Sequence, residues 1–243
     1  MSLNPLDIIN GTFSLTFVVI SLFIGFLILS RYFKYKEKIY FLVGMTWILI
    51  SEPWWPSSLS FLVSLNNGEG LTPALYFLVG NTLVPLAIAL WLIAFTEFLL
   101  TEKRKIILIA FSVLGILFEI IFFILLYVNP NLIGTLTGTP PVDVSYKSFI
   151  MIFLLFFILI VVITGLFFAR LSLKSKDKEV NLKGKLLVIA YITFLIGAIM
   201  DSSLPLNELT VIFTRLLLIL SAICWYGGFL LPKWMKKLFL KKK

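Results

Sequence analysis

Long apolar runs separated by short polar linkers are the feature that most limits how this chain can fold. Each run is about 20 residues long or longer, enough for a helix to cross a hydrocarbon core of about 30 Å. The predicted spans are residues 11–32, 40–64, 72–98, 105–128, 147–171, 184–205 and 208–231. We therefore expect an all-α polytopic membrane protein, a bundle of seven transmembrane helices.

Composition supports a membrane environment for the whole chain. Of the 243 residues, 60% are hydrophobic and 14% are charged, whereas soluble domains are about half apolar and about a quarter charged. The longest linkers, residues 129–146 and 170–185, leave no room for a soluble domain. Residues 1–243 are thus predicted to form one membrane domain that ends in a basic tail, residues 232–243.

The distribution of Lys and Arg predicts the orientation of the chain. All but two of the 21 basic residues lie in the linkers after the first, third and fifth predicted spans or in the tail. The two exceptions are Lys147, on the opposite side, and Arg215, inside a span. Basic residues accumulate in cytoplasmic loops, so we expect the N-terminus outside and the C-terminus in the cytoplasm of a multi-pass cell-membrane protein.

The net charge of +9 follows from this positive-inside distribution. Attraction to anionic lipid heads explains it further, so no nucleic-acid partner is expected. Residues 232–239 are predicted to lie along the inner surface as a short amphipathic segment. The alternative is that the tail and the basic inner loops dock a cytoplasmic protein partner.

The chain also shows a possible 3+1+3 parallel repeat. Spans one to three can be laid over spans five to seven, with the fourth as a connector. An offset of 134 positions puts Trp91 on Trp225 and Asn81 on Arg215. This plan occurs among some transporters. Chance similarity between apolar helices is the alternative.

Four charged residues fall inside the predicted spans, where charges are costly and often mark function. They are Glu52, Glu119, Asp201 and Arg215, with Asn81 as a neutral companion. Counting helical rise places the four charges between the bilayer midplane and its outer boundary. We expect them to share one pocket that opens outward. The alternative is an ion pair that fixes helix register.

Arg215 stays charged at this depth and should hold one carboxylate in a forked pair, either Asp201 or Glu52. A carboxylate left unpaired in the membrane would take up a proton. Such a group is what a proton-coupled or pH-sensing site needs.

The most unusual segment is Ser51-Glu52-Pro53-Trp54-Trp55-Pro56. Its two prolines each remove a backbone donor, which predicts a kink or an unwound turn. Trp54 and Trp55 could then stack on an organic cation or a planar ligand. The alternative is that they anchor the helix at the membrane interface.

Several catalytic classes are excluded by residues that the sequence lacks. There is no histidine, which excludes His-ligated zinc hydrolases and Ser-His sites. Asp201 is the only Asp within a predicted span, so no membrane aspartyl dyad is expected. The sequence has no Gly-rich phosphate loop and no CxxC motif. We expect no catalysis, no metal and no cofactor.

The segments that carry a family resemblance are 184–201 and 215–228. On these segments the chain resembles the seven-span sensor regions of some prokaryotic histidine kinases and uncharacterised multipass proteins of archaea. The predicted topology is also similar to that of microbial rhodopsins. No lysine lies between Leu209 and Leu231, which excludes a retinal Schiff base.

Two main function classes remain after these exclusions. The first is a receptor-like or sensory protein that binds a small or lipidic ligand from outside and relays a shift through its basic inner loops. The second is a proton-coupled transporter of small solutes, and a third is a structural subunit that contacts only lipids. The inner halves of the spans offer few polar groups to hydrate a path. This outward bias favours the receptor.

Overall fold

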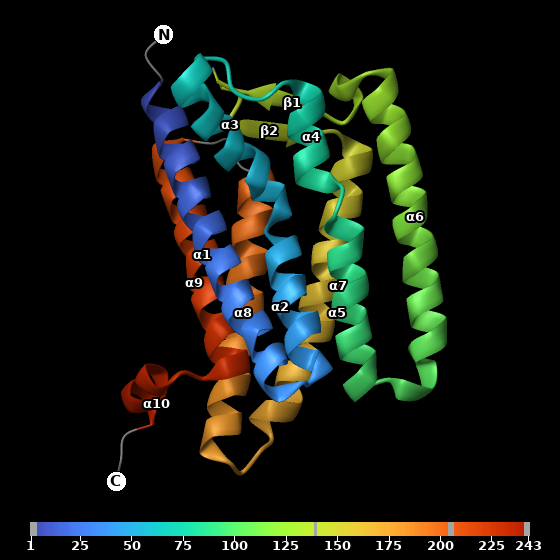
Figure 1. Ribbon diagram of the computed structural model, residues 1–243, viewed down its shortest axis with the longest axis vertical. Helices are drawn as coiled ribbons and strands as arrows, with labels where there is room; N and C mark the ends of the chain where they lie inside the picture. Colours follow the sequence, from blue (N-terminus) through green and yellow to red (C-terminus); the bar gives the residue numbers. More distant parts are fainter. Residues whose placement is uncertain (1–3, 139, 204–206, 241–243) are drawn as a thin grey trace.

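The computed structural model describes residues 4–138, 140–203 and 207–240. Long helices stand side by side in a bundle (Figure 1), which confirms the all-helical class. Within the described residues, six helical stretches are long and apolar enough to cross a membrane, as in a multi-pass membrane protein. They are Pro5–Tyr35, Pro73–Phe98, Thr101–Val128, Ser148–Leu173, Lys178–Ser203 and Glu208–Leu230.

The two ends of the bundle differ in character. A β-hairpin and the start of α1 (Pro5–Tyr35) lie at the top of Figure 1, which we call the hairpin end. The linkers rich in Lys and the start of the last helix, α10, lie at the bottom, which we call the basic end.

The segment predicted as one span at 40–64 is divided in the middle. It forms α2 (Lys38–Ile50), a 3-10 turn η1 (Glu52–Trp54) and α3 (Trp55–Asn67). Pro53 and Pro56 stand at the starts of η1 and α3, where a proline needs no helical hydrogen bond. The kink predicted from these prolines is confirmed. The three pieces follow one another from the basic end to the hairpin end (Figure 1).

The next predicted span, 72–98, also contains a break. It forms α4 (Pro73–Asn81) and α5 (Val84–Phe98), with Thr82 and Leu83 between them and Pro85 just after the break. Pro85 packs against Gly115 of α6 (Arg104–Val128), where a Cβ on the glycine would lie 3.1 Å from the proline ring. The short η2 turn (Thr101–Lys103) joins α5 to α6.

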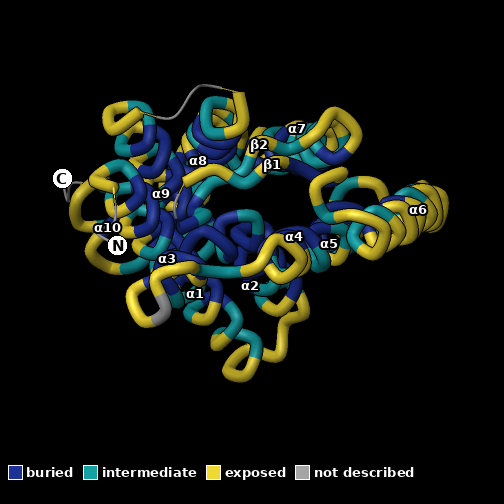
Figure 2. Tube along the Cα trace, turned by 90° about the horizontal axis from the view of Figure 1, so that it is seen from above, coloured by how far each residue is buried: buried dark blue, intermediate teal, exposed yellow. Residues whose placement is uncertain are grey.

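Helix α6 forms one edge of the bundle and is mostly exposed (Figure 2). Only Gly115, Phe118 and Phe122 are buried, and its outward side chains are large and apolar. Such a surface is unfavourable in water and suits contact with lipid tails.

The linker 129–146, for which no secondary structure was predicted, contains a hairpin. After the η3 turn (Pro130–Leu132), β1 (Gly134–Thr137) pairs antiparallel with β2 (Asp143–Tyr146), and Thr137 stands opposite Asp143. Gly138 turns the chain with a φ of 93°, a conformation that favours glycine. A Cβ there would lie 2.8 Å from Oδ1 of Asp7, so the hairpin packs closely against the start of α1.

The other long helices are α7 (Ser148–Leu173), α8 (Lys178–Ser203) and α9 (Glu208–Leu230). The bundle interior contains the indoles of Trp47, Trp91 and Trp225, each about 1% exposed. The Trp225 ring centroid lies 4.6 Å from that of Trp47 and 5.7 Å from that of Trp91. This aromatic contact joins α2, α5 and α9.

The basic tail is helical in its described part. Leu231 adopts a φ of 44° and Pro232 follows, so the chain turns into α10 (Lys233–Phe239), which projects from the bundle (Figure 1). Met235 is buried, and Lys236 forms an ion pair with Glu179 of α8. The described part of the tail is thus a short helix, and its amphipathic character and its place on the membrane surface stay predictions.

The described helices extend beyond several predicted bounds. Helix α1 begins at Pro5, capped by the Asn4 side chain, rather than at residue 11. Helix α8 begins at Lys178 rather than at residue 184. The end of the sixth predicted span at 204–205 and the terminal Lys241, Lys242 and Lys243 lie outside the described residues.

Candidate functional site

A buried guanidinium lies near the hairpin end of the bundle. Arg215 of α9 is 1% exposed and forms an ion pair with Asp201 of α8. Its Nε donates to Oγ of Ser14 at 3.1 Å, and its Nη2 donates to Oδ1 of Asn10 at 3.0 Å. The buried charge is thus balanced by the Asp201 carboxylate, and two of the guanidinium nitrogens make hydrogen bonds, while Nη1 meets Asp201 as an ion pair without hydrogen-bond geometry.

Asp201 divides its two oxygens between two partners. Oδ1 faces Arg215, and Oδ2 accepts a hydrogen bond of 2.8 Å from the indole nitrogen of Trp54. Asp201 and Glu52 were the two carboxylates expected beside Arg215, and in the structure Asp201 is the one that pairs with it. The expected forked geometry is wrong, because Trp54 occupies the second oxygen. We call Asn10, Ser14, Trp54, Asp201 and Arg215 the Arg215 cluster.

The hairpin is tied to the Arg215 cluster. The amide nitrogen of Asn10 donates to the backbone oxygen of Val142 at 3.1 Å, while its Oδ1 accepts from Arg215. Asp143, the next residue, accepts a hydrogen bond of 3.1 Å from the Thr137 hydroxyl. The hairpin therefore brings a second carboxylate to the side of the cluster.

The environment of the hairpin alters the ionisation of its side chains. Burial, with the charge of Asp201 as a smaller cause, raises the pKa of Asp143 from 3.8 to about 6. Burial also raises the pKa of Tyr146 well above that of a free phenol. At neutral pH, Asp143 is therefore mainly ionised and Tyr146 keeps its proton.

A cavity lies under the hairpin. Its polar part is formed by Trp54, Asp143, Tyr146, Asp201 and Arg215. The rest of the wall is mostly apolar and comes mainly from α5, α7 and α8. It includes Ile88, Met151, Leu154, Leu155, Phe194 and Ala198.

This wall makes the cavity amphipathic along its length. The charged groups gather at the hairpin end, and the apolar wall extends from there into the bundle. Ser202, one of the lining residues, is exposed, so the cavity reaches the surface beside the C-terminal end of α8. A ligand with one polar head and one apolar chain matches this distribution of lining groups.

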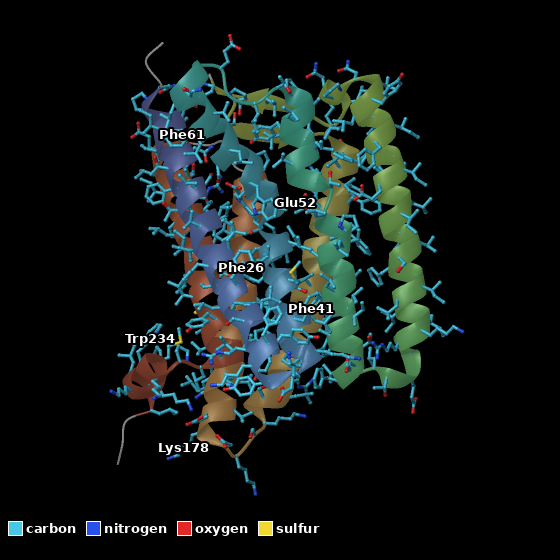
Figure 3. The ribbon with its side chains drawn as sticks, viewed as in Figure 1. Phe26, Phe41, Glu52, Phe61, Lys178 and Trp234 are labelled. Atoms are coloured by element: carbon cyan, nitrogen blue, oxygen red, sulfur yellow. The ribbon has the colours of Figure 1, made fainter. Side chains whose placement is uncertain are left out.

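Glu52 was predicted to face this pocket, and that position is wrong. Its side chain is 1% exposed and turns toward the break between α4 and α5. The backbone nitrogen of Leu83 lies 2.8 Å from Oε1 and 2.9 Å from Oε2 of Glu52. Glu52 thus caps the first turn of α5. A carboxylate is stabilising at this position, because the N-terminus of a helix carries a partial positive charge. Figure 3 shows Glu52 above the middle of the bundle, where α2 gives way to α3.

The structure does not bring Glu119, Asn81 and Trp55 to the cavity wall either. The carboxylate of Glu119, on α6, is buried and has no hydrogen bond within the described residues. The Asn81 amide donates to the Phe77 backbone oxygen at 3.0 Å, one turn back in α4. The Trp55 indole donates to Ser51 at 3.1 Å. Three of the seven predicted site residues, Trp54, Asp201 and Arg215, line one cavity together.

The predicted site missed Asn10, Ser14, Asp143 and Tyr146. Asn10 and Ser14 stand four positions apart, which places them on one face of a helix, and that polar face was visible in the sequence. The alternation in Val142-Asp143-Val144-Ser145-Tyr146 after two prolines is a strand signal in the longest linker. The expectation that Asp201 is the only Asp within a helical span is also wrong, because Asp7 lies in α1 and is 6% exposed.

The comparisons with known proteins give no match: no family model, no curated protein and no solved structure matches this chain. Among the described residues, no group of three or more Asp, Glu or Cys side chains could hold a metal ion.

Proposed function

We propose that this chain is a receptor-like or sensory membrane protein of seven spans that binds an amphipathic ligand in the cavity under its hairpin. The single observation that carries the proposal is the pairing of a charged cluster with an apolar wall in one cavity. Buried charges are costly, and inside membrane proteins they commonly mark ligand or ion sites.

The seventh span of the proposal is the divided segment α2–η1–α3. Each of its two helices has 13 residues, too few to cross a membrane alone. Together with η1 they run from one end of the bundle to the other (Figure 1). Seven crossings put the two termini on opposite sides of the membrane.

The proposed orientation puts the hairpin end outside the cell. The basic linkers gather at the other end, and the positive-inside rule makes that end cytoplasmic. The exposed Trp234, Leu238 and Phe239 of α10 would then enter the inner lipid surface while its lysines meet anionic heads. The cavity would accordingly receive its ligand from outside or from the outer leaflet.

Signal relay in this proposal passes along α8 and α9. Arg215 and Asp201 hold the outer parts of these helices together, and their inner ends adjoin the basic linker and α10. A ligand that shifts the Arg215 cluster would move the two helices relative to each other. A cytoplasmic protein at the basic end would detect that shift.

Photolabelling tests the binding site. The probe is a dodecyl alcohol that carries a diazirine near the end of its chain, added to protein in nanodiscs and mapped by peptide mass spectrometry. We expect saturable labelling of α7 and α8 at Met151, Leu155 or Phe194. Ala198→Phe fills the cavity and should abolish this labelling. Ile196→Phe is the matched control, because Ile196 is 43% exposed on the outward face of α8, and it should leave the labelling unchanged.

Equal labelling of the wild type and of the Ala198→Phe variant, or labelling confined to the exposed face of α6, would contradict the proposed site.

A proton-coupled transporter is the second candidate, favoured by one observation. Two consecutive spans are broken, and the buried carboxylate of Glu52 joins the two breaks through Leu83. Broken helices that end near the middle of the membrane are typical of transporter sites. Uptake of an amphiphilic amine into proteoliposomes driven by a pH gradient, and lost in Glu52→Gln, would support the transporter over the receptor.

A further inference from the structure

The charges that line the cavity do not balance. Among its described lining residues, Asp143 and Asp201 are acidic and Arg215 is the one base. Arg215 is paired with Asp201, and its other nitrogens donate to Asn10 and Ser14. The described wall is therefore left with one negative charge that has no basic partner.

Asp143 is the carboxylate without a basic partner. Its hydrogen bond comes from the neutral hydroxyl of Thr137, and no ion pair of Asp143 is found among the described residues. It lies in the hairpin, at the polar end of the cavity. Its pKa of about 6 lies below neutral pH, so the carboxylate carries its charge there.

Two further groups at the same end suit a cation. Trp54 donates its N–H to Asp201 and is one of the residues that line the cavity, so its ring is placed to offer a cation–π contact. The Tyr146 hydroxyl is buried. The Asn81 side chain is close enough to act on it, but the two groups make no hydrogen bond of ordinary geometry. A buried hydroxyl that lines a cavity can accept from or donate to a bound head group.

An anionic head group fits this end poorly. Arg215 is already paired with Asp201, and the two carboxylates would repel a phosphate or a fatty acid. The apolar wall below the polar end requires a hydrocarbon body on the ligand.

We propose that the ligand is an amphiphilic amine, with its basic nitrogen held by Asp143 at the hairpin and its hydrocarbon chain between α5, α7 and α8. This inference rests on the proposed binding function and names the chemical class of its ligand. Asp143 is the counter-ion, Tyr146 supplies a hydrogen bond and the Trp54 ring covers the ammonium. The Arg215–Asp201 pair fixes the position of Trp54.

The test is displacement of the dodecyl diazirine alcohol by three unlabelled competitors with the same chain. They are dodecylammonium, dodecanol and dodecyl sulfate, at concentrations below their micelle thresholds, with wild-type protein in nanodiscs of neutral lipid. We expect dodecylammonium to displace the probe at a concentration at least about tenfold lower than the alcohol, and the sulfate to be weakest.

The variant Asp143→Asn should bring dodecylammonium and dodecanol within about twofold of each other while the alcohol still displaces the probe. Asp177→Asn, a carboxylate at the basic end, is the matched control and should keep the wild-type order.

The outcomes separate the two proposals. If the sulfate or the alcohol equals the ammonium compound in the wild type, the amine inference fails while the binding site stands. If no competitor displaces the probe and Ala198→Phe labels as the wild type does, the proposed function itself fails. An Asp143→Asn variant that keeps the full ammonium preference would remove Asp143 as the counter-ion.

Discussion

The indole nitrogen of Trp54 donates to Oδ2 of Asp201 over 2.8 Å, although 147 positions of sequence separate the two residues. The bond joins the 3-10 turn of the divided segment to the C-terminal end of α8. Trp54 is held further by an edge-to-face contact with Phe17 of α1, with ring centroids 5.1 Å apart. The turn that the two prolines create is thus fixed to two other helices.

Replacing Trp54 by Phe keeps much of the aromatic ring but removes the N–H donor to the partly buried Asp201 carboxylate. The variant should therefore be less stable. We expect a loss of about 1–3 kcal/mol in the free energy of unfolding, measured by dodecyl sulfate titration in mixed micelles. Trp55→Phe removes only a bond to Ser51 one turn away and should cost about 1 kcal/mol or less. Equal losses in the two variants would contradict the cross-link.

Arg215→Met should be among the most destabilising single substitutions. It leaves the partly buried Asp201 carboxylate without its cation, and breaking a buried pair in this way typically costs about 3–5 kcal/mol. The double variant Arg215→Met with Asp201→Asn should recover part of that loss, since no lone charge remains. A double variant that is less stable by the full sum of the two single losses would mean that the ion pair contributes no coupling.

Glu52→Ala should loosen the break between α4 and α5, because the Leu83 N–H loses its acceptor in a buried place. We expect about 1–3 kcal/mol of destabilisation and faster amide hydrogen exchange at Leu83 and Val84. Glu52→Gln keeps a side-chain oxygen that can accept from Leu83, so this variant should lose much less stability than Glu52→Ala. Unchanged exchange in the alanine variant would remove the capping role of Glu52.

The charge of Asp143 should make stability depend on pH. Besides burial, the groups that act on its pKa are Asp201 of α8, Arg215 of α9, the backbone of Val144 and the Thr137 hydroxyl. Its folded pKa of about 6 exceeds the ordinary 3.8, so the folded state binds its proton more tightly than the unfolded chain. This contribution is complete below about pH 4 and is lost as pH rises through about 6, with a total of up to roughly 3 kcal/mol.

In Asp143→Asn, that part of the pH dependence should disappear, as seen by unfolding titrations between about pH 4 and pH 7.5. Asp177→Asn should retain the wild-type profile. Ammonium binding should show the opposite trend and strengthen as pH rises through about 6, because only the ionised carboxylate is a counter-ion. Parallel pH profiles of the wild type and Asp143→Asn would show that Asp143 does not titrate in this range.

The sequence predicted the helices well and the site only in part. Apolar runs and prolines determine where helices form and break, so the bundle and the kink at Pro53 could be predicted. The position of Arg215 inside an apolar helix likewise predicted an acidic partner nearby. Which acid pairs with Arg215 depends on how each helix is rotated about its axis and on how the chain turns at η1. Glu52 faces Leu83 because the break in the next span leaves a backbone N–H that needs an acceptor.

The contribution of the hairpin could not be predicted from helical periodicity. Asp143 lies in a linker, outside the segments in which charges are unusual, and it reaches the cavity only because the hairpin folds back over the bundle. Its docking depends on close contacts of Gly138 with Asp7 and of Gly70 with Pro140. Such contacts between distant segments leave no periodic signal in the sequence.

Equilibrium binding of radiolabelled dodecylammonium to the protein in neutral nanodiscs tests the central claim most directly. If the cavity is the ligand site, wild-type protein should bind the amine saturably with about one molecule per chain, and Ala198→Phe should show only the linear partition of empty nanodiscs. Linear partition in the wild type, equal to that of Ala198→Phe and of empty nanodiscs, would contradict the account.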